Sequence, residues 1–139
     1  MGRQAIPCDN AGVGENGVAV LIVDDLAPFR RAARAVIGAT PGFEVVGDAE
    51  TGEAAVEMVD ELEPALVLMD INMPGINGIE ATRRITGAHP DVVVMLVSTY
   101  QAADLPADAR DCGAAAYVNK EDLGPKVVQD LWAEHAPGR

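Results

Sequence analysis

The stretch ALVLMDINMPGING, from Ala65 to Gly78, contains an uninterrupted apolar run that ends in a carboxylate, Asp70. A run of this kind, without alternating polar residues, is typical of a strand buried on both faces of a parallel sheet. The turn-forming residues that follow lead into a helical pattern after Asn77. Asp70 is therefore expected at the carboxyl end of a strand, the edge at which open parallel sheets bind ligands.

Other apolar runs in the chain also end in polar groups. Val18 to Val23 is followed by Asp24 and Asp25, Val92 to Val97 by Ser98 and Thr99, and Ala115 to Val118 by Asn119 and Lys120. The carboxyl ends of neighbouring parallel strands meet at one edge of their sheet. The sequence therefore predicts that acids, hydroxyls and a lysine converge around Asp70.

The segments between these runs predict helices. A shorter strand is expected at Phe43 to Val46, and a short helix from about Pro106 to Cys112 that ends at Gly113. Mostly apolar residues repeat with helical spacing in four stripes: Phe29, Ala33, Val36 and Ile37; Ala55, Met58, Val59 and Leu62; Ile79, Thr82 and Ile85; Val128, Leu131, Trp132 and His135. Five strands alternating with five helices predict an α/β fold, with a parallel sheet covered by helices on both faces.

The length of 139 residues accommodates one domain with a sizeable core. We expect the domain at residues 18–135, after a glycine-rich flexible N-terminal tail at residues 1–17 and before a short C-terminal tail at residues 136–139. The sequence has no apolar run of membrane-spanning length and no signal-peptide pattern. Its two cysteines, Cys8 and Cys112, form no metal or redox motif, so we predict a cytoplasmic location without a disulfide.

The formal net charge of -12 limits the partners that this chain can bind. An acidic surface repels nucleic-acid phosphates, so direct nucleic-acid binding is not expected. The charge suits a basic protein partner or a bound cation.

Clustered carboxylates indicate both a cation and a reaction. Two like charges about 4 Å apart cost about 4 kcal/mol at an effective dielectric of about 20, so Asp24 and Asp25 beside Asp70 favour a divalent ion. Mg²⁺ suits a site with few carboxylates and several waters. A carboxylate can also act as a nucleophile toward a phosphoryl group, a reaction that needs positioning and charge neutralisation more than covalent machinery.

Four segments together resemble the receiver domain of bacterial two-component response regulators. They are VDD at 23–25, LMDINMPGINGIEATRRI at 68–85, VMLVST at 94–99 and GAAAYVNK at 113–120. The resemblance implies a doubly wound, flavodoxin-like five-stranded sheet with strand order 2-1-3-4-5. The segment EATRRI at 80–85 is similar to receivers of regulators with helix-turn-helix outputs.

The resemblance also implies roles for the acidic residues. Asp70 matches the phospho-acceptor, which would receive its phosphoryl group from the phosphohistidine of a sensor histidine kinase. Asp25 matches the direct Mg²⁺ ligand, and Asp24 the residue that supports the ion through water. The backbone carbonyl of Asn72 matches the third protein ligand.

The remaining matched residues lie on the predicted fifth strand or just after the predicted fourth and fifth strands. Ser98 matches the hydroxyl that contacts the phosphoryl group, and Lys120 the lysine that pairs with it. Tyr117 matches the aromatic residue that turns inward when the hydroxyl is recruited, which would switch an output surface. Two departures are Thr99, where the family usually has a smaller residue, and Glu121, where many receivers have proline.

Several alternatives stay open at this point. Asp24 could be a helix cap, Ser98 an ordinary loop hydroxyl, Lys120 a surface lysine and Tyr117 a static half-buried ring. An aspartate-nucleophile phosphatase would carry D-x-D at the nucleophile, whereas the residue two after Asp70 is an asparagine. A degenerate receiver that only binds partners is a third reading. The residues do not tell whether this is a stand-alone receiver, a homodimer or a piece of a DNA-binding regulator.

Overall fold

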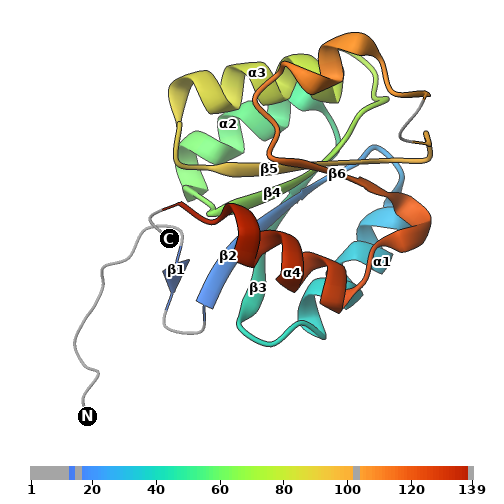
Figure 1. Ribbon diagram of the computed structural model, residues 1–139. Coiled ribbons are helices and arrows are strands. Elements are labelled where there is room, and N and C mark those ends of the chain that lie inside the picture. The colour runs from blue at the N-terminus through green and yellow to red at the C-terminus, as the bar shows by residue number, and fades with distance from the viewer. Residues whose placement is uncertain (1–12, 15–16, 102–103, 138–139) are drawn as a thin grey trace.

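The computed structural model describes residues 13–14, 17–101 and 104–137. A sheet lies between two layers of helices (Figure 1). Its parallel strands are β2 (Gly17–Val23), β3 (Phe43–Ala49), β4 (Leu66–Asp70), β5 (Val93–Ser98) and β6 (Ala116–Asn119). The α-helices are α1 (Ala27–Gly38), α2 (Gly52–Leu62), α3 (Gly78–Ala88) and α4 (Pro125–His135).

The strand order in space is β3-β2-β4-β5-β6. Numbered along the chain, these five parallel strands have the order 2-1-3-4-5, which confirms the predicted fold. The strand expected at Phe43 to Val46 continues to Ala49, where it pairs with Val23. The pairing with β2 continues past a register shift between Val20 and Leu21, which leaves Val46 without a partner in β2.

Part of the expected N-terminal tail takes a defined place. Val13 and Gly14 form β1, a two-residue strand that pairs antiparallel with Gly17 and Val18 at the start of β2. The other tail positions, residues 1–12 and 15–16, lie outside the described residues, as do residues 138–139.

Two apolar cores fill the two faces of the sheet. Each strand points alternate side chains to opposite faces, so both cores draw on the same central strands. One core joins the sheet to α2 and α3, through residues that include Val67, Met69, Ala55, Val59, Ile79 and Ile85. The other joins it to α1 and α4, through residues that include Leu66, Leu68, Ala33, Ile37 and Val128. Most residues of the predicted helical stripes thus face the sheet, whereas Leu62, at the end of α2, is exposed.

The start of α3 lies directly against the end of β4. Asn77 caps the helix, because its side-chain Oδ1 accepts a hydrogen bond of 2.9 Å from the Glu80 amide. A Cβ atom at Gly78 would lie 1.9 Å from the carbonyl oxygen of Asp70, which only glycine avoids. This close approach fixes the backbone of Asp70.

The short helix expected from Pro106 to Cys112 is not an α-helix. The chain instead forms η3, a 3-10 turn at Ala107–Arg110. Ala109 is the buried residue of this turn, and Cys112, just after the turn, is also buried. The described residues therefore hold four α-helices where five helices were expected. Among them, none is long and apolar enough to cross a membrane.

Candidate functional site

Three carboxylates lie together at the carboxyl edge of the sheet. Asp24 and Asp25 follow β2, and Asp70 ends β4, which pairs with β2 through Val23 and Met69. One carboxylate oxygen from each acid lies within 4.8 Å of the other two. Asp24 and Asp70 are buried and Asp25 is exposed. The predicted convergence of the acids is therefore present in the fold.

Lys120 reaches the same site from the end of the edge strand β6. It begins η4 (Lys120–Asp122), directly after the edge strand β6. Its Nζ atom lies 2.7 Å from Asp24 Oδ2 and 3.6 Å from Asp70 Oδ1. The Lys120 ammonium and the Asp24 carboxylate form a close ion pair, but their geometry is not that of a hydrogen bond. With a side chain only 14% exposed, Lys120 is not a solvated surface lysine.

Asp24 organises the turn between β2 and α1. Its Oδ1 atom accepts a hydrogen bond of 2.9 Å from the Leu26 amide, and its backbone carbonyl accepts one of 2.8 Å from the Arg30 guanidinium. The N-cap of α1 is Leu26, so Asp24 closes a turn before the helix and does not cap it. The side chain therefore points into the acid cluster.

The residues present fit a hard divalent cation. Oxygen ligands suit such an ion, and the three acids supply them from two rigid strands. Asp24 Oδ2 is buried without a hydrogen bond, so it retains the capacity to accept one from a metal-bound water. Asn72, the expected backbone ligand, is exposed and lies two residues after Asp70 in the chain.

Burial and neighbouring charge hold Asp70 partly protonated. Its pKa is raised from 3.8 to about 6, first because the carboxyl is removed from water and next because of the Asp24 charge. Asp25 raises this pKa further, whereas Lys120 lowers it. At neutral pH most Asp70 side chains are ionised. Because burial destabilises this carboxylate, a cation bound beside it would stabilise the ionised form.

Ser98 and Tyr117 lie beside the acid cluster, on β5 and β6. Ser98 ends β5, is buried, and accepts a hydrogen bond of 3.3 Å from the Tyr100 amide at Oγ. The Tyr117 hydroxyl donates to the carbonyl oxygen of Ser98 at 3.2 Å and also to that of Tyr100. The ring packs against the core shared with α2 and α3, so Tyr117 points inward. Burial raises the pKa of its hydroxyl.

Two site residues were not identified from the sequence. The Lys120 ammonium lies 4.4 Å from the centre of the Phe29 ring, and Arg30 binds the Asp24 carbonyl. Phe29 was assigned to the apolar stripe of α1, and it does pack against that core. The available signal was the position of both residues in the first turn after the acid pair.

The raised pKa of Asp70 predicts a pH-dependent stability. In metal-free protein, the Asp70 carboxyl carbon should titrate by NMR with a midpoint near pH 6. The folded state binds this proton more tightly than the unfolded state, so the contribution of Asp70 to stability is fully present below about pH 4 and is lost as pH rises through about 6. The loss should be about 3 kcal/mol relative to Asp70→Asn, measured by urea denaturation. A midpoint near 4 would contradict this.

Comparisons with known proteins agree with this geometry. The family described as the response regulator receiver domain matches residues 20–129. The chain is 41% identical over 112 residues to the transcriptional regulatory protein DegU of Brevibacillus brevis, covering 81% of this chain and 48% of that protein. It is 42% identical to a protein-glutamate methylesterase/protein-glutamine glutaminase of Photobacterium profundum, covering 82% and 28%.

A solved structure is similar as well. In the crystal structure of the CheX-CheY-BeF3-Mg+2 complex from Borrelia burgdorferi, one chain superposes with a TM-score of 0.73 at 27% identity, covering 84% of this chain and 87% of that chain. The chain spans about half the length of DegU. The motifs, the strand order and these matches together assign the chain to the response regulator receiver domain family of two-component systems.

Proposed function

We propose that this receiver domain is a signalling switch in which Asp70 accepts a phosphoryl group. The observation that carries the proposal is the arrangement of one buried carboxylate beside two further acids and one lysine. The donor would be the phosphohistidine of a sensor histidine kinase or a small acyl phosphate. This assignment makes the chain a substrate and catalyst of its own modification, without a metabolic product.

The chemical step is a displacement at phosphorus. An ionised oxygen of Asp70 forms the new P–O bond while the P–N bond to the donor histidine breaks, and the bonding electrons leave with that nitrogen. The product is an acyl phosphate on Asp70. In dephosphorylation, water attacks phosphorus and the P–O bond to Asp70 breaks, with its electrons returning to the carboxylate. Inorganic phosphate and a proton are released.

The surrounding residues would position and neutralise the phosphoryl group. Mg²⁺, held by Asp25, Asp70 and the Asn72 carbonyl with Asp24 behind water, would offset the negative charge that gathers around phosphorus. Lys120 is 3.6 Å from Asp70 and would pair with a phosphoryl oxygen. Ser98 would donate its hydroxyl to another. Thr99 is exposed beside this position, so it borders the approach to the site.

The other functions considered fit less well. A phosphatase of the D-x-D type lacks its second acid, because Asn72 stands in that position. A binding module without phosphotransfer gives no reason for burying Asp24 and Asp70 together. The named methylesterase activity belongs to a relative of which this chain matches 28% of the length, so it is not proposed for this chain.

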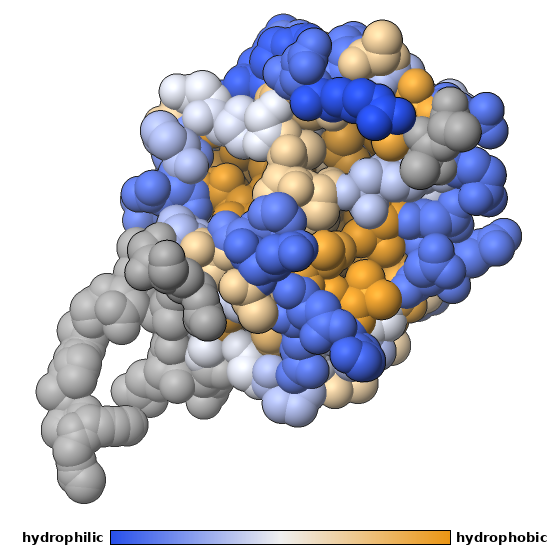
Figure 2. Space-filling model, viewed as in Figure 1, coloured by the Kyte–Doolittle hydropathy of each residue, from blue (hydrophilic) through white to orange (hydrophobic). Residues whose placement is uncertain are grey.

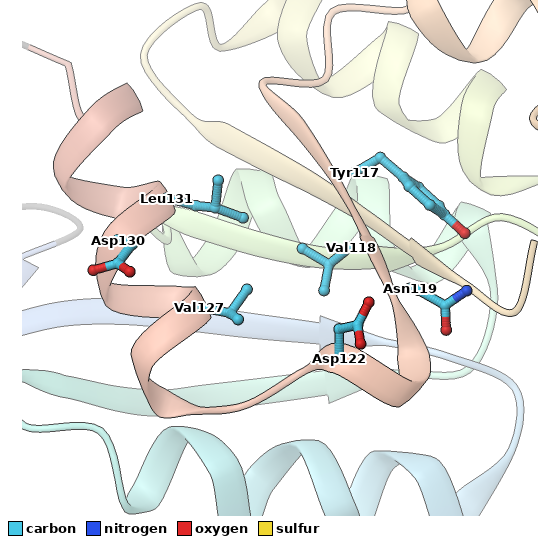
Figure 3. Close-up of a pocket in the computed structure, with 7 residues that line it drawn as sticks. All are labelled: Tyr117, Val118, Asn119, Asp122, Val127, Asp130 and Leu131. Atoms are coloured by element: carbon cyan, nitrogen blue, oxygen red, sulfur yellow. The ribbon is translucent and has the colours of Figure 1, made fainter. Parts of the chain in front are cut away.

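The proposed output surface consists of η3, β6 and α4. A groove of about 490 Å³ lies between β6 and α4. In Figure 3, Val118 points from β6 toward Val127 and Leu131 of α4, whereas the Tyr117 ring points to the opposite side of the strand. Figure 2 shows apolar surface on both sides of β6 among hydrophilic residues. A second copy or an output domain would bind at this surface.

We place the chain in the cytoplasm, without a nucleic-acid or membrane contact of its own.

The phosphorylation site is tested by intact-mass measurement. Incubation with acetyl phosphate and Mg²⁺ should add one phosphoryl group to the wild type and none to Asp70→Asn. Asp91→Asn, at an exposed acid before β5, is the matched control and should gain the same group as the wild type. An equal adduct on Asp70→Asn would place the acceptor elsewhere.

The metal site is tested through stability. Asp25 is exposed and its charge repels Asp70, so Asp25→Ala in EDTA should be more stable than the wild type by about 1 kcal/mol. Asp24→Ala should instead be less stable, because it removes the acceptor of the Leu26 amide and the nearest carboxylate to Lys120. Millimolar Mg²⁺ should stabilise the wild type in urea denaturation and affect Asp25→Ala much less. Equal stabilisation of both proteins would exclude Asp25 as a ligand.

The switch is tested by adding beryllofluoride and Mg²⁺, which together mimic the phosphoryl group. Amide NMR shifts should extend from Asp70 to the segment from Thr99 to Lys126. They should be smaller in Tyr117→Ala, because the hydroxyl that joins β6 to the Ser98 and Tyr100 carbonyls is gone. Shifts confined to a shell around Asp70 would show that Tyr117 is a static ring.

A further inference from the structure

The Phe29 ring and the Lys120 side chain meet at the edge of the acid cluster. The Lys120 ammonium lies 4.4 Å from the ring centre, within the range of a cation–π contact. Phe29 belongs to the first turns of α1, whereas Lys120 follows β6. The contact therefore spans the sheet between its central strand β2 and its edge strand β6.

The ring completes an enclosure around a flexible ammonium group. Asp24 and Asp70 supply negative charge on one side, at 2.7 and 3.6 Å, and the ring supplies a face on another. Lysine carries its charge on a four-carbon stem with many rotamers, so a position inside the site must be held by its surroundings. Because the Lys120 side chain is only 14% exposed, these surroundings are protein groups and little of them is solvent.

We propose that Phe29 is a positioning residue that keeps the Lys120 ammonium beside Asp70. The inference rests on the proposed function, because it assigns a task to a residue next to the phospho-acceptor. The packing of Phe29 on the core under α1 holds the ring in place. The ring in turn limits where the ammonium can go.

The ring differs from the carboxylates in one important respect. A divalent cation bound by the three acids repels the ammonium and weakens their hold on it, since the acids then share their charge with the ion. The attraction of an uncharged ring for the ammonium does not depend on that shared charge. Phe29 should therefore matter most when the acid cluster is loaded, which is the state in which Lys120 must stay near the incoming phosphoryl group.

The size of the effect follows from the strength of such contacts. If the ammonium is in place for a smaller fraction of the time, the rate falls in proportion to that fraction. Loss of a largely desolvated cation–π contact corresponds to a decrease of about threefold to thirtyfold.

The variants are chosen to separate the ring from its apolar bulk. Phe29→Leu keeps an apolar side chain but removes the ring, and Phe29→Tyr keeps the ring. Phe43→Leu is the matched control, because Phe43 packs on the same core, beside Trp132, from a position on β3. Urea denaturation of each variant identifies any loss caused by unfolding.

The first measurement needs no phosphorylation. In the wild type, ring current should move the Lys120 ε-methylene proton signal upfield, both in EDTA and in Mg²⁺, with the signal identified by its absence in Lys120→Arg. Phe29→Leu should return it to the ordinary lysine position, and Phe43→Leu should leave it unchanged. An ordinary signal in the wild type with Mg²⁺ would overturn the proposal.

The second measurement is the rate of phosphoryl uptake from acetyl phosphate at fixed Mg²⁺. Phe29→Leu should be about threefold to thirtyfold slower, and Phe29→Tyr and Phe43→Leu close to the wild type. A wild-type rate in Phe29→Leu, or an equal loss in Phe43→Leu, would overturn the positioning role. If the wild type gains no phosphoryl group, the proposed function fails, and the ring-current signal still decides whether Phe29 holds Lys120.

Discussion

The parallel pairing of β2 with β4 is the interaction on which the site depends. Val23 lies opposite Met69 in this pairing, so the next residues along each strand emerge side by side. These residues include Asp24 and Asp70, whose carboxylates would avoid each other in an unfolded chain. Backbone hydrogen bonds and burial on both faces of the sheet hold them together against their repulsion.

The charges of the site are not balanced within the chain. Three acids face one ammonium, and the pKa of Asp70 is raised first by burial and then by the charges of Asp24 and Asp25. Part of the folding free energy therefore opposes this repulsion, as is common where a protein holds a reactive or ligand-binding group. A cation and a phosphoryl group supply complementary charges to such a site. Cation binding, protonation of Asp70 and the stability of the fold therefore all depend on the same three acids and Lys120.

The side of the sheet next to β6 is built differently from the other. β6 has four residues, and the segment before it contains a 3-10 turn that is shorter than the helix expected from Pro106 to Cys112. Tyr117 fills this region by hydrogen bonding to the carbonyls of Ser98 and Tyr100. Because these carbonyls lie at and just after the end of β5, the position of the Tyr117 ring depends on the position of that strand end. The Tyr117 hydroxyl thus connects β6 to the end of β5, and Val118, the next residue of β6, lines the groove beside α4.

The sequence alone determined the fold and the members of the acid cluster. Continuous apolar runs predict central parallel strands because both faces are buried, and a polar residue that follows such a run must lie at the carboxyl edge. Asp24, Asp25, Asp70 and Lys120 each follow a run of this kind, so their meeting could be predicted without coordinates. Asn77 could likewise be recognised as a cap from its spacing to Glu80.

Only the tertiary structure decided which partners these residues have. Phe29 belongs to an apolar helical stripe, and periodicity cannot tell that the face of its ring meets Lys120, far along the chain. The 3-10 turn at η3 depends on how Ala109 and Cys112 fit against the sheet, which local propensity does not encode. The inward position of Tyr117 also depends on carbonyls from another strand. Contacts between distant segments arise from packing, and a pattern read along one segment does not contain them.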